Sequence, residues 1–75
     1  MLELVKKFIE EIIQNFNFSR NRIGYDYDED NDFYKIWHTD LKFDQNEENE
    51  EKVSTLMNDL LYGNFIYNFS YENNR

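Results

Sequence analysis

The chain has 75 residues, and its 16 Asp and Glu against 8 Lys and Arg give a net charge of −8 at pH 7. It contains no Cys, which excludes disulfides and thiolate metal sites, and its two glycines cannot form a glycine-rich phosphate loop. A negative charge of this density repels nucleic acid and anionic membranes. We therefore expect the protein to bind neither of them directly.

Residues 1–75 are expected to form a single domain. A chain this short buries only about 60% of the surface that it exposes when unfolded. One Trp, six Tyr and seven Phe compensate, because each buried aromatic side chain removes about 150–250 Å² from water. No apolar run approaches the ~20 residues of a membrane span, and residues 1–8 lack the layout of a signal peptide. We therefore expect a cytoplasmic protein.

The first half of the chain changes from helical to strand periodicity. Apolar residues recur at steps of three and four over residues 2–16, which predicts an amphipathic helix. Alternation then places Ile23, Tyr25 and Tyr27 on one face of a strand. Residues 29–32 are Asp, Asn and Glu and predict a turn. The return strand runs from Phe33 to about Thr39.

A second helix and a third strand follow. Asp44 is the predicted N-cap, with Glu47 three residues later, and the apolar stripe of the helix begins at Val53. Gly63 stands where a helix-ending glycine is expected. Alternating aromatic residues then predict a strand over residues 65–71. Residues 40–44 predict either a bridge or a fourth strand.

The predicted fold class is α+β, in the order α-β-β-α-β. The simplest packing places both helices on one face of a small antiparallel sheet of three, or with residues 40–44 four, strands. The predicted core contains Ile9, Ile12, Ile13, Phe16, Ile23, Tyr25, Trp37, Leu56, Leu60, Phe65 and Phe69.

No catalytic or metal site is predicted, and no cofactor. The acids from Asp26 onward resemble the start of an EF-hand loop, but Asn31 replaces its glycine and Trp37 its final glutamate. Zinc catalysis needs about three protein ligands, and the chain has one His and no Cys. His38, with Asp40 nearby, is therefore expected to be an exposed strand residue and not a metal ligand. The sequence therefore predicts a protein without enzymatic activity.

Two acidic runs are the candidate binding surfaces. In an extended strand alternate residues project the same way about 6.6–7 Å apart, so Asp26, Asp28 and Asp30 would form a row resembling a phosphate backbone. Aromatic side chains would anchor the contact, because Tyr and Trp are enriched at interface hot spots. The predicted partner-binding residues are Asp26, Tyr27, Asp28, Glu29, Asp30, Asp32, Tyr34, Trp37, Glu47, Glu48, Glu50 and Glu51.

In size, acidity and Asn-rich, Pro-free composition the chain resembles small phage-encoded inhibitors of bacterial defence, including anti-CRISPR proteins. It is similar in the same respects to immunity proteins and antitoxins. The likeness is one of composition and transfers no site residue. We expect an inhibitor that occludes a basic nucleic-acid-handling protein, as a nucleic-acid mimic. The alternatives are an immunity protein or antitoxin, and a homodimer or other homo-oligomeric subunit.

Overall fold

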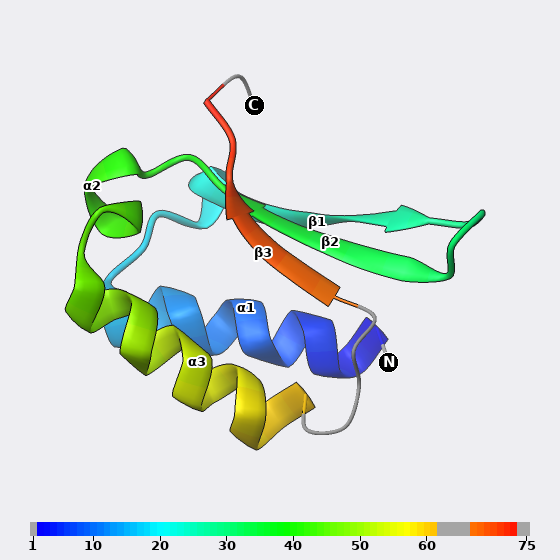
Figure 1. Ribbon diagram of the computed structural model, residues 1–75, viewed down its shortest axis with the longest axis horizontal. Coiled ribbons are helices and arrows are strands. Elements are labelled where there is room, and N and C mark those ends of the chain that lie inside the picture. Colours follow the sequence, from blue (N-terminus) through cyan, green and yellow to red (C-terminus); the bar gives the residue numbers. More distant parts are fainter. Residues whose placement is uncertain (1, 62–66, 74–75) are drawn as a thin grey trace.

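The computed structural model describes residues 2–61 and 67–73 (Figure 1). The elements follow in the order α1 (Leu2–Phe16), the 3₁₀ turn η1 (Arg20–Arg22), β1 (Ile23–Asp28), β2 (Phe33–His38), α2 (Leu41–Asp44), α3 (Glu47–Leu61) and β3 (Tyr67–Tyr71). Helices α1 and α3 lie side by side under one face of the sheet. This arrangement confirms the α+β class. No helix in the described ranges is long and apolar enough to cross a bilayer.

The three strands lie in the order β1-β2-β3. Strands β1 and β2 form the predicted hairpin, in which Tyr25 pairs with Ile36 and Asp28 with Phe33. Strand β3 runs parallel to β2, so the sheet is mixed and the prediction of an antiparallel sheet is wrong for this pair. The reason is that α3 carries the chain back along the sheet, and β3 then starts beside the beginning of β2, as in other strand–helix–strand crossovers.

Helix α1 ends in a hydrogen-bonded cap. Asn17 adopts a left-handed backbone with φ of 52°, and the Phe18 N–H donates to the Ile13 carbonyl at 3.1 Å. This is the Schellman arrangement, which asparagine tolerates. It turns Phe18 into the core, where only 8% of its surface is exposed.

Residues 40–44 form neither a strand nor the predicted cap of the second helix. They hold the one-turn helix α2, whose N-cap Asp40 accepts a hydrogen bond from the Phe43 N–H at 3.1 Å. The cap of α3 is Asn46, whose Oδ1 accepts from the Glu48 N–H at 2.9 Å. Asp44 is therefore the last residue of α2. The sequence did not separate Asp44 from Asn46 because both residue types are good caps.

The core lies between the helices and the sheet. Its buried apolar residues are Val5, Phe8, Ile12, Phe18, Ile23, Ile36 and Val53. Of the predicted core, Ile12 and Ile23 are buried, and Ile9, Ile13, Phe16, Tyr25, Leu56, Leu60 and Phe69 pack against this cluster while partly buried. Phe65 lies outside the described residues.

The prediction of Trp37 in the core is wrong. Side chains alternate along β2, and the face turned to the helices carries Ile36 and His38, which are 0% and 1% exposed. Trp37 lies on the opposite face, which no helix of the described chain covers (Figure 1). There it packs over Gly24, its cross-strand partner.

Candidate binding surfaces

The acidic hairpin turn is held by its own side chains. Asp28 accepts hydrogen bonds through Oδ1 from the backbone N–H of Asp30 at 3.0 Å and of Asn31 at 3.4 Å. Its Oδ2 accepts from the Asn31 side-chain amide at 2.9 Å. These bonds, the one from the Asn31 side chain above all, hold the pKa of Asp28 below its ordinary value. The turn is therefore a defined structure in which one carboxylate has a structural role.

A second bond closes the base of the turn. The Tyr27 hydroxyl donates to Asp32 Oδ1 at 2.6 Å, and the hydrogen bond to this carboxylate raises the pKa of Tyr27 to about 12. Asp32 has a φ of 50°, a left-handed conformation that Asp adopts more readily than most residues. Glu29 and Asp30 are exposed at the tip. The tip thus presents these two acids on a turn that Asp28 and Asp32 hold in shape.

The expected row of three carboxylates is not formed. Asp26 and Asp28 lie on β1 and share the face that the helices leave uncovered, where Asp26 stands opposite Lys35 of β2. Asp30 follows the end of the strand and lies within the turn. Extended geometry, and with it the spacing of about 6.6–7 Å, therefore applies to Asp26 and Asp28 alone.

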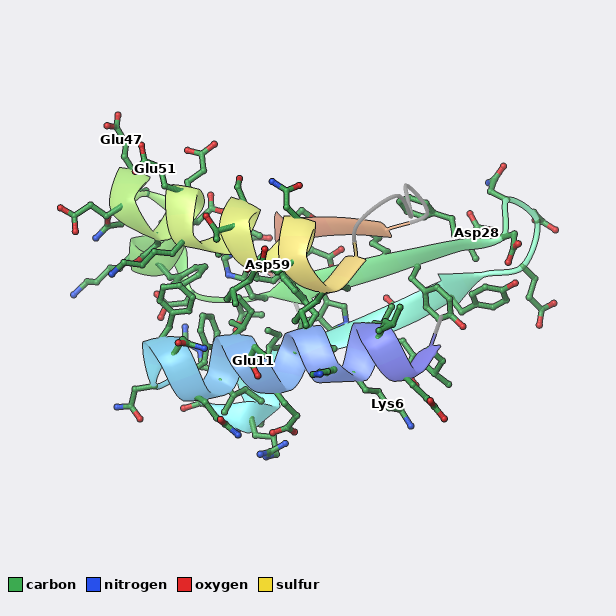
Figure 2. All side chains as sticks on the ribbon, turned by 90° about the horizontal axis from the view of Figure 1, so that it is seen from below. Lys6, Glu11, Asp28, Glu47, Glu51 and Asp59 are labelled. Carbon is green, nitrogen blue, oxygen red and sulfur yellow. The ribbon has the colours of Figure 1, made fainter. Side chains whose placement is uncertain are left out.

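The other acidic run lies at the opposite end of the molecule. Glu47, Glu48, Glu50 and Glu51 are exposed on the first turns of α3, where the helix dipole favours negative charge. Figure 2 shows Glu47 and Glu51 at one end and Asp28 at the other. The longest dimension of the fold is 31 Å. The two runs therefore form two separate surfaces.

The three predicted aromatic anchors do not share a surface. Tyr27 is 44% exposed, and its ring lies 4.8 Å from that of Tyr34. Tyr34 is on the same side of the sheet, is partly buried and packs against the core. Trp37 lies on the other face, over Gly24. Tyr27 is consequently the most exposed of the three anchor candidates, and its hydroxyl is bonded to the acidic turn.

His38 is buried, although an exposed strand residue was expected. Its Nδ1 accepts from the Asp40 N–H at 3.3 Å, and its Nε2 lies 3.3 Å from Asp44 Oδ1. The acceptor role of Nδ1 places the proton of the neutral ring on Nε2, which donates to Asp44. Burial lowers the pKa of His38, and the nearby Asp44 opposes this only in part. The imidazole thus joins both ends of α2 to the sheet.

A cavity of about 370 Å³ opens beside His38. Four elements supply its described lining, which consists of His38, Phe43, Asp44, Glu50, Val53 and Phe69. Sequence reasoning named Glu50 but missed Asp44 as the partner of His38, since it paired the histidine with Asp40. The sequence pattern did not indicate the short helix α2, which brings Asp44 back to within hydrogen-bond distance of His38.

No protein-family model, characterised protein or solved structure matches this chain. Among residues 2–61 and 67–73, no group of three or more His, Cys, Asp or Glu side chains is placed to hold a metal ion.

Proposed function

We propose that this protein is a non-enzymatic inhibitor that binds a basic nucleic-acid-handling protein and occludes its nucleic-acid site. The observation that carries the proposal is the hairpin of β1 and β2, which projects beyond the N-terminal end of α1 and bears an acidic turn held by its own hydrogen bonds (Figure 1). This role is of the anti-defence type, in which an acidic surface replaces the phosphates that the partner binds.

The electrostatics of the hairpin support this role. Five acids lie within residues 26–32, and the chain as a whole carries −8. A concentrated field of this sign accelerates encounter with a basic surface and is screened over about 10 Å at 0.1 M salt. Association is therefore expected to be fast at low salt and to slow as salt is added.

The internal bonds of the turn support it as well. Because Asp28 and Asp32 are bonded within the hairpin, the exposed carboxylates of Glu29 and Asp30 are presented from a preformed backbone. A preformed surface loses less conformational freedom on binding than a flexible one. The turn can thus meet Lys and Arg side chains without first becoming ordered.

Affinity also requires contact area, because an exposed ion pair contributes only about 0–1 kcal/mol. Tyr27 supplies that area beside the turn, since nearly half of its surface is exposed. Its hydroxyl is bonded to Asp32, which fixes the ring where a partner would contact it. We therefore assign the anchor to Tyr27 ahead of Tyr34 and Trp37.

Capture from a bacterial lysate at low salt, followed by elution with salt, tests the proposal. The test variant is Glu29→Gln/Asp30→Asn, which removes two charges from the tip and leaves the side-chain bonds of Asp28 and Asp32 in place. The matched control Glu47→Gln/Glu48→Gln removes two charges at the other end of the molecule. We expect the hairpin variant to lose the captured protein and the control to retain it.

The captured protein is then assayed for nucleic-acid binding with and without the inhibitor. Competition that the hairpin variant lacks supports occlusion. Undiminished capture by both variants would show that these charges do not make the interface. Loss in the control alone would place the binding surface at the start of α3. A captured protein that keeps its nucleic acid at saturating inhibitor would refute occlusion.

A further inference from the structure

We propose that the cavity beside His38 binds one organic cation, a guanidinium or a primary ammonium group. The residues that line the cavity belong to α2, the first half of α3, the end of β2 and the middle of β3, and α2 and the start of α3 lie far from the hairpin turn (Figures 1 and 2). The inference does not depend on the proposed function, because it concerns a different surface and is tested with small probes.

The cavity has the size of a small binding site, and both apolar and polar residues line it. Its volume of about 370 Å³ falls at the lower end of the usual range for ligand pockets, about 300–1,000 Å³. Phe43, Val53 and Phe69 provide apolar walls from three elements. A guanidinium packs well against such walls, because it is weakly hydrated and stacks on aromatic rings.

The charged residues of the cavity favour a ligand of positive charge. Asp44 and Glu50 contribute two carboxylates, and no Lys or Arg is among the described lining residues. An anion would be repelled by both carboxylates, whereas a cation would gain from both. The absence of a three-ligand cluster in the described chain disfavours a metal ion. An organic cation satisfies both the charge and the apolar walls.

His38 holds one of the carboxylates in position. The His38 side chain is 2% exposed, and its imidazole lines the cavity and donates from Nε2 to Asp44 Oδ1. A carboxylate has about four lone-pair sites, so this single bond leaves Asp44 able to accept from a ligand. The neutral ring adds no opposing charge to the wall.

Protonation of His38 would oppose binding. The ring faces Asp44 and Asp40 of the α2 segment and Arg22 of η1, and Glu50 of α3 lines the same cavity. The aromatic rings around it belong to Phe18, Phe43, Phe69 and Tyr71. A cation in the cavity and a proton on the imidazole would place two positive charges in one small space. Occupation of the cavity is therefore expected to shift the titration of His38 to lower pH.

The test is an NMR titration of the whole chain at constant ionic strength. The probes are methylguanidinium and a blocked Gly-Arg-Gly tripeptide, with sodium as the reference cation. The readouts are the imidazole signals of His38 and the ring signals of Phe43 and Phe69. We expect saturable shifts at these rings, and a His38 titration that moves to lower pH when a probe is bound.

Two variants separate the cavity from the general field of the helix. Glu50→Gln removes a lining carboxylate and should weaken binding about fivefold, the equivalent of one favourable exposed ion pair. Glu51→Gln removes the same charge one residue later, outside the described lining, and should change the affinity less than about twofold. Both residues are exposed, so the fold should be retained, and the backbone spectrum checks this.

The outcomes are distinct. Tighter binding of the tripeptide would identify a protein side chain as the natural source of the cation, and tighter binding of methylguanidinium a small molecule; either supports the site. Shifts that do not saturate, or equal weakening in the two variants, would overturn it. Because neither variant alters the hairpin, this result is independent of the capture experiment.

Discussion

Replacement of Gly24 by Ala tests the packing on the uncovered face of the sheet. A Cβ at this position would lie 2.6 Å from Trp37 Cζ2 and 2.9 Å from Cε2. Favourable contact between carbon atoms begins at about 3.5–4.0 Å, so the indole or the strand must shift by roughly an ångström. The atoms in question belong to a stiff ring system and not to the end of a flexible chain.

The magnitude follows from two opposing effects. Overpacking of this kind costs about 1–3 kcal/mol. Loss of glycine's freedom in the unfolded chain returns about 0.4–1 kcal/mol. We therefore expect Gly24→Ala to lower the free energy of unfolding by about 1–2 kcal/mol. In a domain of this size that corresponds to a Tm lower by roughly 4–16 °C.

The assay is urea unfolding followed by circular dichroism, which can be used with and without Trp37, the single Trp of the chain. The matched background is Trp37→Val, which removes the indole and keeps a strand-forming residue. There Gly24→Ala should stabilise by about 0.4–1 kcal/mol, because only the unfolded-state effect remains. An equal loss of stability in both backgrounds would refute the role of the indole contact.

Three further predictions concern the core and the helix ends. Burial lowers the pKa of His38, so the folded state favours the neutral ring. The contribution of His38 to stability should therefore be complete above about pH 6.5 and fall as the pH drops below that value. His38→Gln should reduce the change in Tm between pH 7 and pH 5, measured by thermal unfolding. Asn46→Ala should cost about 0.5–2 kcal/mol in urea unfolding through loss of the α3 cap, whereas Asn46→Asp should keep it. Ile36→Ala should cost about 2–5 kcal/mol, and Ile36→Val only about 0.5–1.5, since the side chain is fully buried; equal losses would contradict the packing.

Periodicity was sufficient to locate the long helices and the hairpin. The apolar stripe of α1 and the alternation in β1 each have a single geometric solution, and the structure has those elements over nearly the predicted residues. Periodicity could not choose which face of β2 is buried, because Trp37 and Ile36 are both apolar. Packing decided this, since Gly24 leaves room for the indole on the uncovered face.

The parts that sequence did not predict depend on short-range backbone geometry. Residues 40–46 contain three good capping residues, and a four-residue helix has too few positions to show a period. That helix brings Asp44 to His38 and forms the wall of the cavity. The same limit explains why Asp30 is not in the expected row of carboxylates. Strand β1 ends at Asp28, and the consecutive acidic residues that follow show no alternation that would mark the end of the strand.

The topology also decides how the charge can be used. Strand β2 begins beside the acidic turn and ends at His38, and six residues of extended chain span about 20 Å. The acidic turn thus lies at the start of β2, and the acidic run of α3 lies at the other end of the molecule (Figure 2). Charges so far apart are largely screened from each other at physiological salt, where the Debye length is about 8 Å. A partner that contacts only one end therefore gains little from the other, so the net charge of −8 overstates the attraction at either surface. Neutralising two charges at one end should for this reason change the salt dependence of a single interaction and leave any interaction at the other end nearly unaltered.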